Sequence, residues 1–374
     1  MRQAPARKGP KVVLSGYYGF DNCGDEAVLL AMIHCLKKFK PDIRIVVLSG
    51  NPKKTQELYA VNAVNRWNPL MVAFELLTCR LVLSGGGSLL QDVTSSISLR
   101  YYLAIIKLAV MLKKRVMIYS QGIGPLNAEK NRARVSKTLN RCHAITVRDE
   151  HSAELLKEIG VARDIQVTCD PVIALDIGDI VSSSLIDELR KAIALGNAEE
   201  SSKPLFMVAM RLWDDNCHIS PVAEFLDTLA KGGWNVLLVP AHHPGDMEAI
   251  KRISGLMTSR PYILDRCLIA REFLALTAQS DMVFSMRLHG LICAMAAGTP
   301  MLGLSYDPKV DAFMEQSGLS RYCLPFAGFS CESAMGLLKE LEALPPGSLQ
   351  LPESRRRELR DMARRTAEQA VALL

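Results

Sequence analysis

Three positively charged or titratable side chains stand close together in residues 284–310, "FSMRLHGLICAMAAGTPMLGLSYDPKV". Arg287 and His289 follow one apolar run, and Lys309 follows the next. In an extended backbone Arg287 and His289 point to the same face, because one residue separates them. Gly290 is expected to begin a helix, whose N-terminus attracts anions. The pattern predicts a site for a small, multiply charged anion, with His289 as an acid or base.

Arg148 brings a further positive charge to the end of an apolar strand, in "TVRDEHS". Strands of a parallel sheet end at the same edge, so Arg148 is expected to point into a cleft there. Lys309 and His289 are expected to be neighbours on adjacent strand ends. Asp149 is expected to cap the helix that follows Arg148. A phosphate ester and a nucleotide diphosphate both suit these charges, and both stay open at this point.

The segment "GYYGFDNCGDEAVL" follows the first predicted strand and combines aromatic, amide and carboxylate side chains. We interpret it as a loop that holds sugar hydroxyls, because aromatic and polar groups together exceed what a helix cap requires. The alternative is an N-capping segment, since Asn and Asp are good caps. The candidate residues of this loop are Tyr18, Asp21, Asn22, Asp25 and Glu26.

Two glycine-rich segments also follow predicted strands. Residues 84–92, "SGGGSLLQD", include Gly86, and residues 120–125, "SQGIGP", include Gln121. Backbone N–H groups at the triple glycine of residues 84–92 can bind an anion, although this segment is neither a Walker A loop nor a GxGxxG fingerprint. In residues 120–125, Gln121 is expected to face the cleft. A tight turn is an equally good interpretation of each segment.

The sequence does not predict a metal site. His242 and His243 are adjacent on a predicted turn and face apart, and no third ligand lies at a useful spacing. Ten cysteines occur without any CxxC pair, which favours buried free thiols in a reducing cytosol. They stand at positions 23, 35, 79, 142, 169, 217, 267, 293, 323 and 331.

Short apolar runs alternate with helical patterns along most of the chain, which is typical of parallel sheets covered by helices on both faces. The predicted strands are residues 11–16, 43–49, 80–84, 115–120, 144–147, 165–169, 205–210, 235–240, 262–264, 281–285 and 300–305. A polar, Ser-rich stretch separates two series of strands. The fold class predicted is therefore α/β, with two doubly wound domains in tandem and the ligand in the cleft between them.

We expect five parts in the chain. A basic tail (residues 1–10) precedes an N-terminal Rossmann-like domain (11–175), and a linker (176–204) leads to a second such domain (205–345). The last part, residues 346–374, contains an Arg-rich helix whose apolar stripe suits packing across the domain junction.

Composition limits the class of protein. The 374 residues have 49% hydrophobic and 22% charged side chains, which is typical of globular chains. The net charge of +6 suits anionic substrates or an anionic membrane surface and is too small to indicate nucleic acid. Residues 101–112 form the longest helical apolar stretch, which is too short to span a bilayer. No signal peptide is recognised at residues 1–10, so a cytoplasmic location is expected.

Taken in order, seven motifs resemble the polysaccharide pyruvyl transferase family, and within it the CsaB-type enzymes of cell-wall polymers. The likeness covers residues 11–320. The motifs are "GYYGFDNCGDEAVL", "SGGGSLLQD", "SQGIGP", "TVRDEHS", "CDPV", "MRLHGLICAMAAGTP" and "YDPKV".

The resemblance implies Rossmann-like domains in the GT-B arrangement, with the acceptor on the N-terminal domain and phosphoenolpyruvate on the C-terminal one. It implies a 4,6-linked pyruvate ketal on N-acetylmannosamine of a lipid-linked secondary cell-wall polymer, a group that anchors S-layer proteins. It implies no metal and no cofactor, with phosphoenolpyruvate as a substrate. The enzyme would be cytoplasmic, with the inner membrane face as a candidate peripheral contact.

The resemblance assigns the key basic positions to Arg148, His289 and Lys309. As a hypothesis, Arg148 and Lys309 hold the donor with help from Arg287 and Gly290, and His289 moves the proton. The acceptor would lie on Tyr18, Asp21, Asn22, Asp25, Gly86 and Gln121, and Asp25 or Glu26 stays open as the acid.

Two rival functions stay open at this stage. A GT-B glycosyltransferase would use a nucleotide sugar in the same positively charged cleft. A non-catalytic glycan-binding protein at a membrane surface would use the basic tail and "ESRRRELRDMARRTAEQ" as lipid contacts. The plainer interpretation of that last helix is a solvated charged face with its apolar stripe on the protein.

Overall fold

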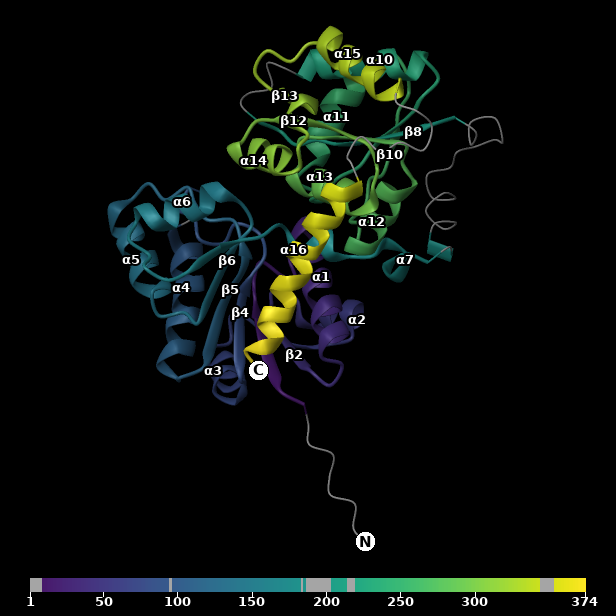
Figure 1. The fold of residues 1–374 in the computed structure, drawn as a ribbon. Helices are drawn as coiled ribbons and strands as arrows, with labels where there is room; N and C mark the ends of the chain where they lie inside the picture. Colours follow the sequence, from purple (N-terminus) through teal and green to yellow (C-terminus); the bar gives the residue numbers. More distant parts are fainter. Residues whose placement is uncertain (1–8, 94–95, 183, 186–202, 214–218, 344–352) are drawn as a thin grey trace. The chain divides into compact units, whose positions relative to one another are not determined.

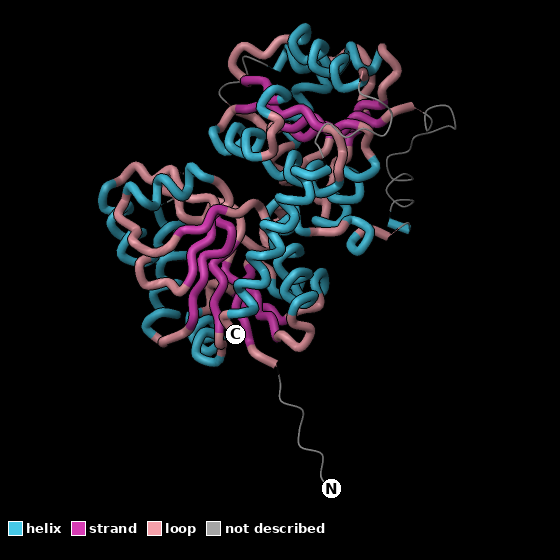
Figure 2. The backbone as a smooth tube through the Cα atoms, viewed as in Figure 1, coloured by secondary structure: helices cyan, strands magenta, loops and turns pink. Residues whose placement is uncertain are grey.

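The computed structural model describes residues 9–93, 96–182, 184–185, 203–213, 219–343 and 353–374. The chain divides into two compact units. Unit 1 consists of the N-terminal residues up to Phe20, Asp25–Ala174 and Asp361–Leu374, and unit 2 of Asp21–Gly24 and Leu175–Arg360. In both units strands alternate with helices (Figures 1 and 2).

Unit 1 is built on a seven-stranded parallel sheet in the order β3-β2-β1-β4-β5-β6-β7. Its central strands are apolar and buried on both faces, as expected of a parallel sheet between helix layers. Leu14 of β1, for example, aligns with Val47 of β2 and Leu83 of β4. The strands are β1 (Lys11–Ser15), β2 (Arg44–Ser49), β3 (Asn62–Asn65), β4 (Leu81–Gly85), β5 (Arg115–Gln121), β6 (Ala144–Val147) and β7 (Ile165–Val167).

Helices cover both faces of this sheet, with α1 and α2 on one side and α4 and α5 on the other (Figure 1). Several begin at side-chain caps: Asn51, Asn68 and Asp149 accept hydrogen bonds from backbone N–H groups in the first turns of α2, α3 and α6. The helices are α1 (Cys23–Phe39), α2 (Pro52–Tyr59), α3 (Pro69–Thr78), α4 (Ser96–Met111), α5 (Glu129–Leu139) and α6 (Glu150–Glu158).

Unit 2 repeats the plan with a six-stranded parallel sheet in the order β10-β9-β8-β11-β12-β13. Aromatic rings fill its core, where Phe225 stands edge-on to Phe284 with centroids 5.4 Å apart. The strands are β8 (Leu205–Ala209), β9 (Asn235–Leu238), β10 (Tyr262–Ile263), β11 (Met282–Ser285), β12 (Met301–Ser305) and β13 (Cys323–Pro325).

The helices of unit 2 also form two layers, with α10, α11 and α15 on one face of the sheet and α12, α13 and α14 on the other (Figure 1). The 3₁₀ turn η1 (Pro171–Ala174) ends the long stretch of unit 1, and η3 (Ser320–Tyr322) precedes β13. The helices are α7 (Ile177–Ile180), α10 (Ile219–Lys231), α11 (Met247–Leu256), α12 (Ala270–Gln279), α13 (Leu288–Ala297), α14 (Pro308–Gln316) and α15 (Cys331–Glu342).

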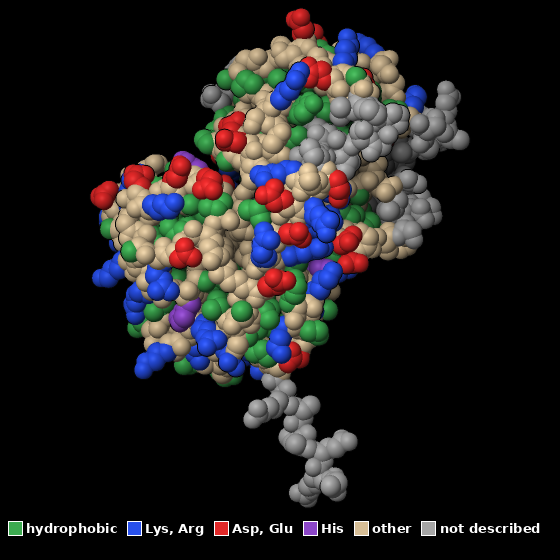
Figure 3. All heavy atoms as spheres, viewed as in Figure 1, with side chains coloured by type: hydrophobic (Ala, Val, Ile, Leu, Met, Phe, Trp, Pro, Cys, Tyr) green, Lys and Arg blue, Asp and Glu red, His purple; other side chains and the backbone are tan. Residues whose placement is uncertain are grey.

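Helix α16 (Glu353–Ala372) contributes its first part to unit 2 and its second part to unit 1. In unit 2, Arg356 donates to the carbonyl of Ala296 at 3.5 Å. In unit 1, the Thr168 hydroxyl donates to the carbonyl of Met362 at 3.1 Å. Acidic and basic side chains are mixed over its outer face (Figure 3). Its apolar stripe is buried against the protein, at Leu359, Ala363, Ala367 and Ala370.

The predicted α/β class is confirmed, and the predicted strands agree with the observed ones to within two residues at each end. The sequence reasoning missed β3, α3 and β13. Parts of the expected basic tail, linker and C-terminal segment lie outside the described residues. Among the described residues no helix is both long and apolar enough to cross a membrane. The nine described cysteines form no disulfide.

Candidate functional site

Arg287 and His289 stand at the junction of β11 and α13 in unit 2. Arg287 is the N-cap of α13, and the helix already begins at Leu288. The Gly290 N–H donates to the Arg287 carbonyl at 2.9 Å and closes the first turn. The expectation of an extended chain up to Gly290 is therefore wrong. Because His289 is helical, it belongs to the first turn of α13, where the helix dipole favours anions.

Arg287 is held by a buried carboxylate from the loop after β9. Asp246 has no exposed surface and binds both Nε, at 3.1 Å, and Nη2 of Arg287. Asp246 also accepts the N–H groups of Ala241 and His242, at 3.1 and 2.9 Å. This carboxylate accepts hydrogen bonds from four donors and orients the guanidinium through its fork of two N–H groups. One edge of Arg287 is thus committed to Asp246, and its side chain is 20% exposed.

The segment Asp21–Gly24 packs beside His289 within unit 2. The Cys23 N–H donates to the carbonyl of Ala241 at 2.9 Å, and Asn22 forms an isolated bridge with His242. A Cβ at Gly24 would overlap the Nδ1 and Cγ atoms of His289 and lie 2.9 Å from its Cβ. Only glycine therefore lets the imidazole lie against this backbone.

Asp21 and Asn22 shape the same segment. Asp21 has a left-handed backbone with φ +58°, which is sparsely populated outside glycine and clusters at functional sites. The Asn22 side-chain oxygen accepts the Gly24 N–H at 3.1 Å. The alternative interpretation of this loop, as an N-capping segment, therefore applies to Asn22, because its side-chain oxygen accepts a hydrogen bond from the backbone of the same loop.

Lys309 lies in the first turn of α14, after β12. Its ammonium pairs with Asp307 at 2.9 Å and lies 5.6 Å from the ring centre of Tyr306. Arg211, after β8, donates to the Tyr306 hydroxyl at 3.2 Å and lies 5.6 Å from the ring of Trp213. Two cations and two aromatic rings thus gather at these strand ends. Sequence reasoning missed Tyr306 and Trp213, although "SYDP" and "RLW" place each of them beside a strand end.

Arg148 follows β6 in unit 1 and is 6% exposed. It donates to the Ser88 hydroxyl at 3.0 Å and approaches Asp149 at 3.4 Å. A Cβ at Gly122 would come within 2.7–2.8 Å of the Arg148 guanidinium, which therefore lies flat over this glycine. The two glycine-rich loops predicted from the sequence thus hold Arg148 at the carboxyl edge of the sheet.

The remaining acceptor candidates of unit 1 gather at the same edge. Gly86 and Gly87 both have positive φ, +75° and +67°, so their N–H groups take directions that other residues disfavour. Asp25 lies close to Gly87. A Cβ added at residue 87 would lie 2.5 Å from Oδ1 of Asp25. Gly86 and Asp25 are therefore placed together by the fold.

Tyr18 and Gln121 are buried and position other groups, which corrects their expected direct contact with an acceptor. The Tyr18 hydroxyl donates to the Gly85 carbonyl at 2.6 Å, and burial followed by Asp25 raises its pKa well above the usual value. The Gln121 amide donates to the Ser84 hydroxyl at 3.0 Å. Its Oε1 has no hydrogen-bond partner among the described residues.

Glu26, considered above as an acid, is a structural clamp. It is 7% exposed and accepts the Gly19 N–H at 2.7 Å and the Tyr59 hydroxyl at 2.6 Å. Gly19 itself has φ +80°, so this clamp fixes the turn between β1 and α1. Both carboxylate oxygens of Glu26 are thus engaged by groups of the fold, which favours a structural role.

The sequence profile of the polysaccharide pyruvyl transferase family matches residues 22–308. The chain belongs to the polysaccharide pyruvyl transferase family. The match runs from Asn22 to the residue before Lys309, and so it includes Arg148, Arg287 and His289. The family predicted from the motifs is confirmed, and it is a family of transferases.

Solved structures resemble this pyruvyl transferase family member along nearly its whole length. HepE of Anabaena, in complex with UDP-glucose, is 16% identical with a TM-score of 0.59, covering 98% of this chain and 97% of its own. A UDP-GlcNAc 2-epimerase from Neisseria meningitidis is 16% identical with a TM-score of 0.61, covering 97% and 100%. A glycosyltransferase from Rickettsia africae is 12% identical with a TM-score of 0.57, covering 96% and 94%. At such identities the likeness establishes the fold, which is of the GT-B class. No curated protein matches the sequence.

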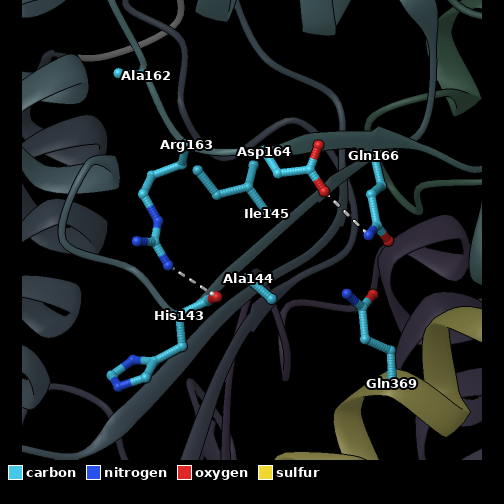
Figure 4. Close-up of a pocket in the computed structure, with 8 residues that line it drawn as sticks. All are labelled: His143, Ala144, Ile145, Ala162, Arg163, Asp164, Gln166 and Gln369. Carbon is cyan, nitrogen blue, oxygen red and sulfur yellow. Dashed lines mark hydrogen bonds between the residues drawn. The ribbon is translucent and has the colours of Figure 1, made fainter.

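One cavity of this transferase family member, of about 290 Å³, lies in unit 1 before β6 and β7. Figure 4 shows Arg163 donating to the carbonyl of His143 and Gln166 donating to Asp164 there, at 3.2 and 3.3 Å. These residues lie just before or at the start of β6 and β7, whereas Arg148 follows β6, so the cavity lies at the opposite edge of the sheet. We therefore keep the candidate site at the carboxyl ends. Within the described ranges no cluster of three His, Cys, Asp or Glu residues could hold a metal.

Proposed function

We propose that the protein transfers a pyruvyl group from phosphoenolpyruvate to a hexose of a cell-wall polysaccharide precursor. The product is a 4,6-linked ketal and the by-product is phosphate, with no cofactor or metal. The observation that best supports this is the placement of His289 in the first turn of α13, against Gly24 and next to Arg287. A helix N-terminus with an imidazole and a guanidinium suits a small anion that must be protonated during its reaction.

The proposed donor contacts use both charge and shape. Arg148, Arg287 and Lys309 bind the phosphate and carboxylate of phosphoenolpyruvate. Gly290, whose N–H donates to the Arg287 carbonyl, contributes through the dipole of the helix N-terminus. The Asp246 and Asp307 partners of Arg287 and Lys309 hold those cations in position before substrate binds. Preformed charges of this kind stabilise a transition state without reorganisation.

In the proposed reaction the methylene carbon of phosphoenolpyruvate gains a proton and becomes a methyl group. A sugar hydroxyl attacks the resulting oxocarbenium-like carbon, and the bond between that carbon and the phosphate oxygen breaks. The second hydroxyl then closes the ketal. The two sugar hydroxyls lose two protons in all. One offsets the proton that the methyl carbon gained, and the other leaves with phosphate. The step therefore balances without an oxidant or a reductant. His289 is the proposed proton shuttle.

The proposed acceptor is N-acetylmannosamine, or a similar hexose, of a lipid-linked secondary cell-wall polymer in the cytoplasm. Asp21, Asn22, Asp25 and Gly86 are its proposed contacts. Tyr18 and Gln121 act through Gly85 and Ser84 as positioning residues. Carboxylate and amide groups on glycine-rich loops suit sugar hydroxyls, which both donate and accept hydrogen bonds.

The test is phosphate release from phosphoenolpyruvate by the purified protein with a synthetic β-N-acetylmannosaminyl disaccharide diphosphate lipid. Acceptor-dependent phosphate and a product heavier by one pyruvate ketal, measured by mass spectrometry, support the proposal. We expect His289→Ala, Arg148→Ala and Lys309→Ala each to lower kcat/KM by at least about 100-fold. Lys130→Ala, on the exposed face of α5, is a matched control expected to keep full activity.

A nucleotide-sugar glycosyltransferase is the second candidate, because similar solved structures contain UDP-glucose or UDP-GlcNAc. Calorimetric binding of phosphoenolpyruvate, UDP and CMP distinguishes the two. Tight nucleotide binding with no phosphoenolpyruvate binding would overturn pyruvyl transfer. Loss of all turnover in His289→Ala, with the fold intact, would exclude a purely glycan-binding protein.

A further inference from the structure

One surface of unit 1 is apolar where a helix normally faces water. Helix α3 and the residue before its cap expose five large apolar side chains, which we call the α3 face: Trp67 (63% exposed), Leu70 (82%), Met71 (46%), Phe74 (59%) and Leu77 (55%). On the other side of the same helix, Val72 and Leu76 are buried in the core. A surface helix usually carries polar residues opposite its buried stripe, so α3 departs from that pattern.

The neighbouring helix extends this surface. Helix α3 packs beside α4, which exposes Ile97 (70%) and Met111 (69%). Exposed apolar side chains scattered singly are ordinary in proteins, whereas a group on adjacent helices marks an interaction surface. Seven of the twelve large exposed apolar residues in the described part of the chain belong to this region.

The charge carried by α3, α4 and the residues that flank them is mostly positive. Residues 66–115 contain seven Lys or Arg and two acids, Glu75 and Asp92. Glu75 pairs with Lys11 at 2.6 Å, and Asp92 accepts the N–H groups of Asn127 and Ala128 at 2.8 and 3.0 Å. Both acids are therefore committed locally. Four of the cations are exposed on or next to α3 and α4: Arg80, Arg100, Lys107 and Lys113.

At the edge of the α3 face, Trp67 lies beside another aromatic ring and a positive charge. Its ring lies 5.4 Å from the ring of Tyr101 and 5.0 Å from the guanidinium of the buried Arg66. Lys114 donates to the carbonyl of Leu77 at 2.8 Å and so places a cation at the end of the helix. Indole rings and long basic side chains beside aliphatic ones are the residue types that favour the interface between lipid headgroups and hydrocarbon.

We propose that the α3 face is a docking surface for an anionic lipid bilayer. The apolar side chains enter the headgroup region, and the exposed cations bind the negatively charged lipids. A second copy of the chain fits less well, because a two-fold interface here would bring the same cations together. Helix α16 fits less well too, because its apolar stripe is buried and its outer charges are mixed (Figure 3).

The test is co-sedimentation of the full chain with vesicles of phosphatidylglycerol and phosphatidylcholine, compared with phosphatidylcholine alone. It needs no substrate, so its outcome is separate from that of the transfer assay. We expect binding to the anionic vesicles at about 0.05 M salt and its loss at about 0.5 M. The double variant Leu70→Ser/Phe74→Ser should bind at least about tenfold more weakly. Its control is Leu256→Ser/Ile263→Ser, which removes exposed apolar side chains from unit 2.

A charge variant tests the second half of the proposal and does not alter α3. Arg100→Glu/Lys107→Glu should also weaken binding at least about tenfold, whereas Lys231→Glu/Lys251→Glu in unit 2 should match the unaltered protein. Failure of the unaltered protein to bind anionic vesicles would overturn the proposal, as would equal binding by the test and control variants. Sedimentation velocity that shows self-association, lost only in Leu70→Ser/Phe74→Ser, would reassign the face to a contact between copies.

Discussion

At the scale of single residues, His289 can take its position because its neighbour Gly24 has no side chain. The backbone of Gly24 and the imidazole occupy adjoining space, and any side chain at residue 24 would compete for it. Asp246 acts in the opposite way, because it holds Arg287 through direct contacts from a fully buried position. Both residues belong to segments distant in sequence from α13.

Gly24→Ala should therefore displace the imidazole of His289. We expect kcat of the proposed transfer to fall about 100-fold, because a displacement of about 1 Å is enough for such a loss. Circular dichroism and thermal unfolding would show whether the fold is retained. Gly255→Ala in α11 is the control, since nothing lies within 4 Å of its added Cβ. Full activity in a folded Gly24→Ala variant would contradict the role given to this contact.

Asp246→Asn should lower the free energy of unfolding by about 3 kcal/mol, because it leaves the Arg287 charge without its buried partner. Urea unfolding at neutral pH measures the change. The surface pair Arg252–Glu248, at 2.8 Å on α11, provides a comparison, and Glu248→Gln should cost less than about 1 kcal/mol. Equal effects in the two variants would show that Asp246 is no more than an ordinary surface partner.

At the scale of elements, each unit joins helices to loops through a few buried polar groups. In unit 2, Asp227 of α10 accepts the N–H groups of Thr258 and Ser259, both at 2.7 Å, and the Thr258 hydroxyl at 2.8 Å. Burial alone raises the pKa of Asp227, but these hydrogen bonds outweigh it and lower the pKa to about 2. The carboxylate thus fixes the loop that leads from α11 to β10.

Asp227 should make stability depend on pH in acid. Its pKa is lower in the folded chain than in the unfolded one, so its contribution is complete above about pH 5 and is lost as pH falls towards 2. We expect Asp227→Asn to cost about 2 kcal/mol at pH 7 and about half as much at pH 3. Chemical denaturation at both pH values measures this. A difference that does not change with pH would mean that Asp227 acts through its shape alone.

At the scale of the whole molecule, thiols are distributed through the cores of both units. Burial raises the pKa of Cys35 and Cys79 to about 11 and of Cys142 and Cys323 to about 12. The thiolate is the reactive form, so these groups are nearly inert at pH 8. The chain therefore carries many cysteines without an evident requirement for disulfides.

Ellman's reagent should accordingly modify Cys35, Cys79, Cys142 and Cys323 slowly at pH 8 in the folded protein. In denaturant, all ten cysteines should react rapidly. Because the four pKa values are raised, the folded-state rate should increase as pH rises above 8, provided that the fold persists. Peptide mapping after a short exposure identifies the modified residues. Rapid labelling of Cys142 in the folded protein would show that its core opens easily.

The sequence by itself determined the class of fold, most of the strands and the strand-end residues. Buried parallel strands are continuous apolar runs, and their signal is local. The sequence analysis missed β3, because only two of its four residues, "NAVN", are apolar. It also missed α3, because a helix that is apolar on both sides lacks the usual helical period of apolar residues. The ordered motifs also identified the family, since each one is a contiguous stretch of sequence.

Only the tertiary structure decided which partner each of these residues has. Arg287 meets Asp246 and His289 meets Gly24 because loops from different strands converge, and no spacing in the sequence records that convergence. The same holds for Tyr18 and Gln121, which were predicted as acceptor contacts, and for Glu26, which was considered as an acid. All three are buried. Their side chains suit either role, and burial depends on the sum of contacts that distant segments make.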